Sequence, residues 1–99
     1  MYIYNVTIHA SGAIGRDVLY FVQHRLFPEW KEREGWAQGR LLRLPQDERD
    51  GVAVALQFEI SDCSLVEEFD VESDPAVQRI RQAYGQYVLF LPTLMEVIA

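Results

Sequence analysis

The sequence contains one cysteine, Cys63, and one lysine, Lys31, and it has no apolar run long enough to cross a membrane. A single cysteine cannot form an internal disulfide, which favours a reducing compartment. The longest apolar run, residues 87–95, is interrupted by Pro92. It is about half of the roughly 20 residues that a membrane-spanning helix needs. A charged leader with an apolar core behind it is also missing. We therefore expect a cytoplasmic protein that does not enter a membrane.

Positive charge is also scarce in this chain. The sequence has 15 acidic residues against 9 basic ones, and its formal net charge is −6. Nucleic acids and anionic membrane surfaces attract proteins through a concentrated positive field, so we expect neither as a partner. Hydrophobic residues make up 49% of the chain and aromatic residues 12%, as in an ordinary globular protein. We expect residues 1–99 to form a single domain.

Two segments show the alternation of side chains that is typical of β-strands. In residues 1–9, one face carries Tyr2, Tyr4, Val6 and Ile8, and the other carries Ile3, Asn5, Thr7 and His9. In residues 52–60, one face carries Val52, Val54, Leu56, Phe58 and Ile60, and the other carries Ala53, Ala55, Gln57 and Glu59. Antiparallel pairing that brings the apolar faces together sets Tyr2 opposite Ile60 and Asn5 opposite Gln57.

Between these strands the apolar spacing becomes that of an amphipathic helix. The stripe predicts a helix over residues 13–33, with Ser11 as its N-cap and Gly35 as its stop; its members are Ile14, Val18, Phe21, Val22 and Leu26. Pro28 removes a backbone donor inside this helix, so we expect a kink or break near Phe27.

A second helical region follows the 52–60 strand. Ser61 and Asp62 are its expected caps, and its apolar positions are Leu65, Val66, Phe69, Val77, Ile80 and Tyr84. Because proline suits the first turn of a helix and not its middle, Asp74-Pro75 predicts two helical pieces separated near residues 72–74.

Two shorter strands complete the pattern. Residues 40–45 predict a half-buried edge strand that ends at Pro45, and the polar turn 46–51 predicts a hairpin through its Asp-Gly pair. The last strand is expected over residues 86–91, with 93–99 either extending it or forming an arm. The order β-α-β-β-α-β favours an α+β split βαβ sandwich, with strand order 4-1-3-2 and both helices on one face.

The sheet face that the helices leave uncovered is too apolar for water and too polar for a second core. Its expected members include Ile3, Asn5, Thr7 and His9, the 53–59 alternation, and Tyr87, Leu89 and Leu91. Such a face suits packing against a copy of itself. We predict a homodimer through this face.

Four motifs resemble a family of small bacterial proteins that is known only as a domain of unknown function. They are I-Y-N-V-T (3–7), F-P-E (27–29), A-L-Q-F (55–58) and T-L-M-E-V-I (93–98), and the resemblance covers essentially the whole chain. The family is similar in fold to the ferredoxin-like dimeric α+β barrels. The resemblance therefore implies that fold and a dimer, and it implies no activity. Many family members carry a histidine directly before the hydrophobic-Pro-Glu segment, where this chain has Leu26, with His24 two residues earlier.

Asn5 and Gln57 are the strongest candidates for a ligand site, because two amides at the centre of a sheet face can orient a carbonyl or carboxylate. Some barrel monooxygenases place an asparagine on the first strand. Alternatively, the two amides bond to each other or to a partner subunit, because buried polar groups need partners. Thr7, His9 and Tyr87 are the further candidate ligand-binding residues.

Other residue types favour structural interpretations. His9 and His24 can shuttle protons near neutral pH, but their separation gives little support for a metal site. Trp30 and Trp36 suit either an aromatic wall for a ligand or anchors of a core or interface. Cys63 is either a thiol with a depressed pKa at a helix start or a structural cysteine. No motif calls for a cofactor or a metal, and we expect neither.

Two functional classes follow. The first is a non-catalytic or small-ligand-binding homodimer of the α+β barrel type. The second is a cofactor-independent monooxygenase-like enzyme in which Asn5, Gln57 and His9 line the pocket. A pocket enclosed between sheet and helices, with unpaired amides pointing into it, would favour the second class.

Overall fold

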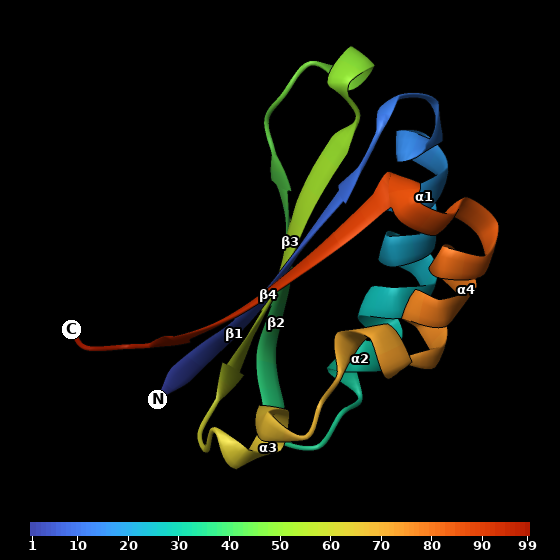
Figure 1. Ribbon diagram of the computed structural model, residues 1–99. Coiled ribbons are helices and arrows are strands. Elements are labelled where there is room, and N and C mark those ends of the chain that lie inside the picture. Colours follow the sequence, from blue (N-terminus) through green and yellow to red (C-terminus); the bar gives the residue numbers. More distant parts are fainter.

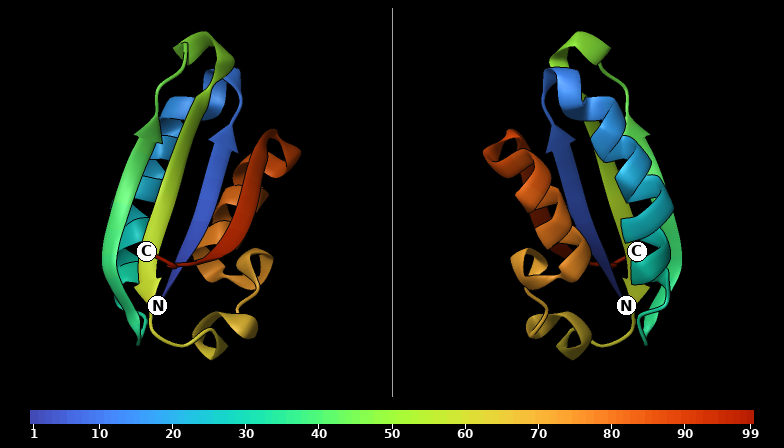
Figure 2. Two further views of the ribbon diagram at one scale, coloured as in Figure 1. Left: turned by 90° about the vertical axis from the view of Figure 1, so that its left-hand side faces the viewer. Right: turned by 90° about the vertical axis from the view of Figure 1, so that its right-hand side faces the viewer.

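The computed structural model, which describes residues 1–47 and 49–99, is a four-stranded antiparallel sheet with its longer helical segments on one face (Figure 1). The strand order is β2-β3-β1-β4, which is the predicted 4-1-3-2 order read from the other edge. Figure 2 shows the sheet from its uncovered side and the helices from theirs. The α+β split βαβ prediction is confirmed.

The elements alternate as the sequence predicts, with several short helical turns added between them. In chain order they are β1 (Tyr2–Ala10), η1 (Gly12–Ile14), α1 (Gly15–Phe21), η2 (Val22–Leu26), α2 (Phe27–Lys31), β2 (Trp36–Leu44), η3 (Glu48–Asp50), β3 (Val52–Ile60), α3 (Ser64–Glu67), η4 (Val71–Ser73), α4 (Pro75–Tyr84), η5 (Gly85–Tyr87) and β4 (Val88–Glu96). Glu48, in the predicted 46–51 turn, lies outside the described residues.

The central pair of strands has the predicted register. β1 pairs with β3 so that Tyr2 lies opposite Ile60 and Asn5 lies opposite Gln57. The helix-covered face of this pair is almost fully buried: Val6, Leu56 and Ile60 have no exposed surface. The period-two pattern therefore fixes both the partner and the face of each strand, because a slip of one residue would turn every apolar side chain to the other side.

The first helical run continues through Pro28 instead of breaking at Phe27. The backbone forms a π-helical turn, η2, in which the N–H of Phe27 donates to the carbonyl of Val22, five residues earlier. Pro28 has no N–H, and it occupies the first turn of α2, where no such donor is required. The predicted kink is thus absorbed as a π-turn. Ser11 precedes η1 but its side chain does not cap it; its hydroxyl donates to the carbonyl of Tyr87 instead.

β2 is longer than the sequence predicts. It starts at Trp36 instead of Arg40, and it lies at the edge of the sheet as expected. The hairpin into β3 requires Gly51, which has a φ of 102° and whose added Cβ would lie 2.1 Å from the carbonyl oxygen of Ala10. The predicted hairpin is confirmed, because β2 and β3 pair antiparallel.

The second helical region consists of separate pieces, as Asp74-Pro75 predicts. Asp74 is buried, and its carboxylate accepts hydrogen bonds from the backbone N–H groups of Ala76 and Val77 at the start of α4. Pro75 is the first residue of that helix. The carboxylate thus satisfies two donors that the helix itself leaves free.

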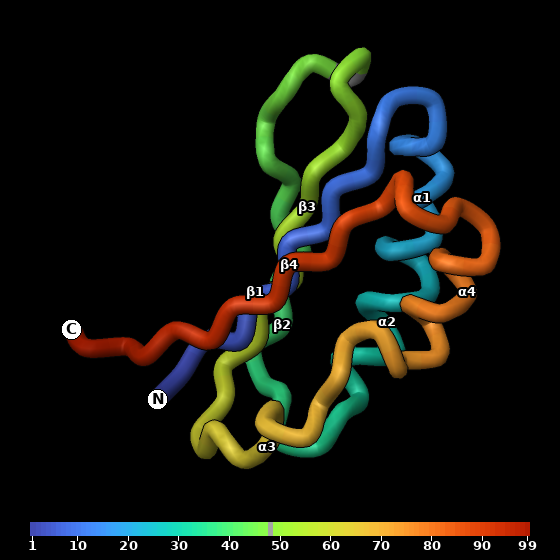
Figure 3. Tube along the Cα trace, in the orientation of Figure 1, coloured from blue at the N-terminus to red at the C-terminus, as the bar shows by residue number. Residues whose placement is uncertain are grey.

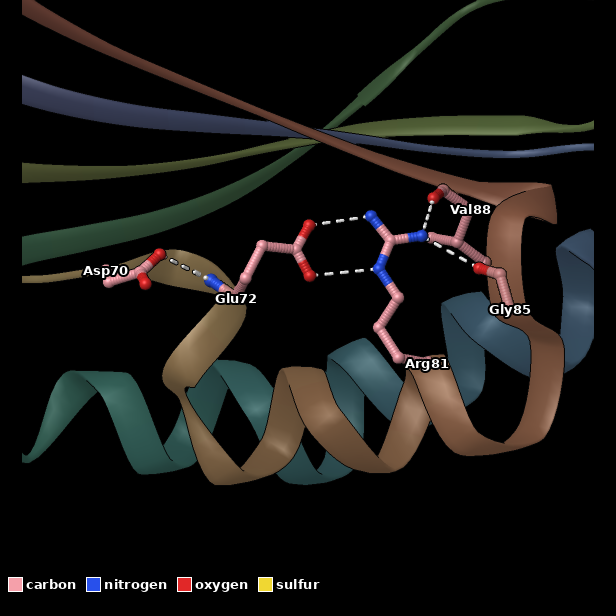
Figure 4. A network of polar contacts seen from close by, with 5 residues as sticks. All are labelled: Asp70, Glu72, Arg81, Gly85 and Val88. Atoms are coloured by element: carbon pink, nitrogen blue, oxygen red, sulfur yellow. Dashed lines mark hydrogen bonds and ion pairs between the residues drawn. The ribbon is translucent and has the colours of Figure 1, made fainter.

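Arg81 holds the turn between α4 and β4 (Figure 4). Its guanidinium donates to both carboxylate oxygens of Glu72, at 2.7 and 3.0 Å, and to the carbonyls of Gly85 and Val88. It also lies over the ring of Phe90, 5.0 Å from its centroid. One side chain therefore ties η4, η5 and the first residues of β4 together.

β4 continues past Pro92, so the alternative of an extended last strand is confirmed and the predicted end at Leu91 is wrong. The strand ends at Glu96, and the N–H of Val97 still donates to the carbonyl of Met1. The C-terminal residues project to the side of the sheet away from the helices (Figures 1 and 3). No helix in the described part of the chain is long and apolar enough to cross a membrane.

Candidate functional site on the open face of the sheet

The sheet face away from the helices, here called the open face, is organised in four rows of cross-strand neighbours. Each row takes one residue from each strand, in the order β2, β3, β1, β4, because opposed residues in a sheet share a face. The rows are Leu44-Ala53-His9-Leu89, Leu42-Ala55-Thr7-Leu91, Arg40-Gln57-Asn5-Thr93 and Ala37-Glu59-Ile3-Met95. The open face is therefore zoned along the strands.

The first two rows, here called the apolar rows, expose large aliphatic side chains at both sheet edges. Leu42 and Leu44 on β2 are 39% and 41% exposed, and Leu89 and Leu91 on β4 are 51% and 54% exposed. Ala53 and Ala55 between them are almost buried, although they lie on the uncovered side. Small side chains flanked by leucines give a broad, shallow apolar surface.

The third row, here called the polar row, consists entirely of side chains that can donate or accept hydrogen bonds, namely Arg40, Gln57, Asn5 and Thr93. The Nε2 of Gln57 donates to the Oδ1 of Asn5 at 3.2 Å, and the Nδ2 of Asn5 donates to the Oγ1 of Thr7 at 3.1 Å. The amide donor of Asn5 thus points toward the apolar rows, whereas that of Gln57 points along the polar row to Asn5. At the other end of the chain of bonds, the Oε1 of Gln57 accepts no hydrogen bond from the described side chains. The mutual bonding of Asn5 and Gln57 was one of the alternatives that the sequence left open.

A hollow of about 350 Å³ adjoins the β2 end of the polar row. It arises from a β-bulge, in which Gln38 and Gly39 together oppose a single β3 residue between the Ala37–Glu59 and Arg40–Gln57 pairs. Gln38 has a φ of 51°, an unfavourable backbone region for a residue other than glycine. A Cβ on Gly39 would lie 2.8 Å from the ring of Phe58, so only glycine fits there. The bulge therefore depends on a strained residue beside a glycine, an arrangement that often accompanies functional sites.

Two oppositely charged side chains line this hollow, together with two amides. Its lining is Ile3, Gln38, Gly39, Arg40, Gln57 and Glu59. Within residues 1–47 and 49–99, the side chains of Arg40 and Glu59 make no hydrogen bond and no ion pair. Both charges are therefore available to a ligand, and the hollow offers donors and acceptors side by side.

The candidate residues named from the sequence lie in different parts of this surface. Asn5, Thr7 and Gln57 are bonded to one another, and His9 lies two rows away among the leucines. Tyr87 is not part of β4: it lies in η5, it is exposed, and its carbonyl accepts the N–H of Ser11. The sequence grouped Tyr87 with the last strand because the alternation of Tyr87, Leu89 and Leu91 begins one residue before β4 does, at Val88.

Arg40, Gln38 and Glu59 were missed as site residues. Arg40 was placed in a strand that was expected to begin there, and Gln38 and Gly39 were left in the preceding loop. The alternation of β2 is broken by the bulge, so the segment from Trp36 shows no period of two. The one available signal was Gly39 itself, because an isolated glycine in a strand often marks a bulge.

Trp30 and Trp36 are core residues and not a ligand wall. They are 1% and 5% exposed, and they pack with Phe69 on the helix-covered side of the sheet, together with Phe58 and Tyr4. Burial in this cluster raises the pKa of Tyr4 to about 12, while the nearby guanidinium of Arg33 opposes that shift. Arg33 lies over the rings of Trp36 and Phe69, 4.7 and 4.5 Å from their centroids.

Cys63 and His24 take no part in the open face. The thiol of Cys63 donates to the carboxylate of Glu67, and this hydrogen bond raises the pKa of the thiol, so the depressed pKa considered from the sequence is wrong. His24 is exposed in η2, and its ring lies 4.2 Å from that of Tyr20. Within residues 1–47 and 49–99, no three His, Cys, Asp or Glu side chains gather as a metal site requires.

A larger hollow of about 520 Å³ lies between α3 and α4, on the helix side of the sheet. Its polar groups already serve the fold: Asp74 caps α4, Asp70 accepts from the N–H of Glu72 and the hydroxyl of Ser73, and Arg33 stacks on aromatic rings. The open face is the better candidate site because its charged groups have no such roles.

Comparisons with known proteins agree with this fold. Residues 1–98 match the model of the family described as "Domain of unknown function (DUF4286)". No curated protein matches the chain. The similar solved structures include the following two. One is the crystal structure of a "putative antibiotic biosynthesis monooxygenase" from Deinococcus radiodurans, with a TM-score of 0.67 and 14% identity over 100% of this chain and 94% of that one. The other is protein SO0527 from Shewanella oneidensis, with a TM-score of 0.59 and 16% identity over 96% of this chain and 93% of that one.

Proposed function

The chain belongs to the DUF4286 family, and from this premise we propose that it is a cytoplasmic homodimer that binds a small ligand beneath a second copy on its open face. The observation that carries the proposal is the pair of apolar rows. Four leucines, two at each edge of the sheet, are between 39% and 54% exposed on a face that no helix covers. Covering them removes apolar surface from water, which is the main favourable term in association.

The position of β4 supports a second copy as the cover. The run from Gln86 to Met95 contains no charged residue, although 24% of the chain is charged. β4 is also an edge strand, and an uncharged edge can pair with another chain. Pro92 interrupts such backbone pairing here, so the side chains on the open face are the better contact surface. Met95 belongs to the fourth row of the open face, and it is exposed together with Val97 and Ile98 in the residues that follow. The C-terminal end of the chain lies on the same side as the open face, where it would contact the second copy (Figure 2).

The polar row supports ligand binding within such a dimer. Asn5, Gln57 and Thr7 form a bonded chain on the open face, directly beside the apolar rows. Two copies that meet through their apolar rows would leave their polar rows as walls of the space between the sheets. Thr7 would lie at the boundary between the dry contact and this space, and His9 would lie within the dry contact.

The alternative is a cofactor-independent monooxygenase-like enzyme. Its support is the likeness of fold to the Deinococcus protein, which at 14% identity concerns the fold alone. The amides that such a pocket needs face away from the helices and bond to each other. Ligand binding without catalysis is therefore the better-supported function. Oxygen uptake in the presence of an electron-rich phenol, abolished by Asn5→Ala, would instead support the enzyme.

Native mass spectrometry of protein purified without denaturation tests the proposal. We expect a complex of twice the 11.5 kDa chain, and we expect Leu91→Arg to convert it to single chains that are still folded by circular dichroism. Leu91→Met, which keeps the apolar character, is the matched control and should remain dimeric. A wild-type protein that is monomeric at micromolar concentration would contradict the proposal.

A further inference from the structure

The hollow beside the β-bulge of β2 has the chemistry of a site for a zwitterion. It contains one cation, Arg40, and one anion, Glu59, on neighbouring strands of the same face. Arg40 lies opposite Gln57 in the polar row, and Glu59 lies in the next row, one step further along β3. The two side chains do not form an ion pair with each other, so a molecule between them would meet both charges.

The amides of the hollow complete the pattern of donors and acceptors. The Nε2 of Gln57 is bonded to Asn5, and this leaves the Oε1 of Gln57 as an acceptor in a hollow that Arg40 and Glu59 also line. Gln38, in the bulge, contributes a second amide to the lining. An ammonium group requires acceptors, and it finds the Glu59 carboxylate and the Oε1 of Gln57. A carboxylate requires donors, and it finds the fork of Arg40, which favours planar, bidentate binding.

The surroundings restrict the class of ligand further. Phosphate or another dianion is disfavoured, because Glu59 lines the same hollow and the chain carries a net charge of −6. An apolar side chain is favoured, because Ile3 lines the hollow and Met95 lies beside Ile3 in the fourth row. The volume of about 350 Å³ is near the lower end for small-molecule sites and suits a compact ligand.

We propose that this hollow binds a free α-amino acid with an apolar side chain, with its carboxylate on Arg40 and its ammonium group on Glu59 and Gln57. The inference deepens the proposed function, because it names the ligand of the space that the second copy covers. The hollow itself is made by one chain. Binding and dimerisation can therefore be tested separately.

The test uses L-leucine as the probe and follows backbone amide chemical shifts by NMR during titration of the full chain. We expect saturable shifts at residues 38–40 and 57–59. N-acetyl-L-leucine lacks the ammonium charge and L-leucine methyl ester lacks the carboxylate, so each should bind at least about tenfold more weakly, as expected for the loss of a charged hydrogen-bonded group. Equal shifts with all three compounds, or no shift at these residues, would overturn the inference.

Variants of the two charged residues give a second readout. Arg40→Gln and Glu59→Gln should each weaken the binding of L-leucine about tenfold or more. Arg25→Gln and Glu32→Gln remove the same charges from exposed helix-side positions and should bind as the wild type does. Full affinity in both Arg40→Gln and Glu59→Gln would overturn the inference. The comparison of leucine with its two derivatives on the wild type gives an answer even if a variant does not fold.

Leu91→Arg separates this inference from the proposed dimer. Selective leucine binding by a monomeric wild type, or by a monomeric Leu91→Arg variant, would support the site while showing that it works without a second copy. A dimeric wild type that does not bind leucine would contradict the site and leave the dimer in place.

Discussion

The two faces of the sheet are built from the same four strands and have opposite surroundings. On the helix-covered face, the large side chains of β1 and β3 are almost fully buried, and the aromatic cluster of Trp30, Trp36 and Phe69 closes one end. On the open face, leucines at both edges remain exposed beside a row of bonded amides. The covered face therefore has its packing partners within the chain, whereas the open face has apolar side chains without packing partners in the described part of the chain.

The covered face should lose the most stability when it is truncated. Leu56 has no exposed surface, so Leu56→Ala should lower the free energy of unfolding by about 2–5 kcal/mol, the range for a buried leucine that leaves a cavity. Leu91→Ala removes the same atoms from the open face and should cost less than about 1 kcal/mol when measured in dilute solution, where chains are separate. Urea denaturation followed by circular dichroism measures both. Equal losses would show that the two faces do not differ in packing within the chain.

The open face should be the one that controls association. Leu91→Arg places a charge on the surface of each copy, and a symmetric contact would contain it twice. We expect the dissociation constant of the dimer to rise by about 100-fold or more, equivalent to about 2.7 kcal/mol. Tyr20→Arg changes an exposed aromatic residue on the helix side and should leave association unchanged. Sedimentation equilibrium of the wild type, Leu91→Arg and Tyr20→Arg makes this comparison. If only Tyr20→Arg weakened the dimer, the contact would lie on the helix side and the account would be wrong.

Burial of Tyr4 on the covered face should also make the free energy of unfolding fall at alkaline pH. Burial raises the pKa of Tyr4 to about 12. In the unfolded chain a tyrosine titrates near 10, so this group adds stability that is complete below pH 10 and is lost as the pH rises through about 12. The loss is of the order of 2 kcal/mol. Between pH 8 and 12 the stability of the wild type should fall relative to that of Tyr4→Phe, which has no hydroxyl to titrate, and parallel curves would contradict the burial effect.

The smallest effect is expected at the Arg81 junction, which is half exposed. The hydrogen bond from Arg81 lowers the pKa of Glu72, so this pair adds stability that is present above the usual pKa of a glutamate and is lost as the pH falls through the lowered value. Because Glu72 is exposed, Glu72→Gln should cost less than about 1 kcal/mol at neutral pH. Thermal denaturation at pH 7 and pH 3 measures the difference, which should shrink at the lower pH. A constant difference would show that the ion pair does not contribute.

The register of β1 and β3 could be predicted residue by residue, because each strand has one apolar face and only one register joins those faces. The start of β2 could not, because the bulge at Gln38 and Gly39 removes the alternation. The passage of the helix through Pro28 also escaped prediction, since a π-turn depends on the packing of the whole run. At the site, Asn5 and Gln57 were found as a pair with Glu59 on the same face, but Arg40 became a neighbour of that pair only once β2 was placed.

The central claim is that a second copy covers the leucines of the open face. The most direct measurement is an isotope-filtered NOE spectrum of a mixture in which half of the chains are labelled with carbon-13. The account predicts contacts between chains from the methyl groups of Leu89 and Leu91, and none from Leu56, which is enclosed within its own chain. A spectrum without contacts between chains, recorded at a concentration where sedimentation shows a single 11.5 kDa species, would contradict it.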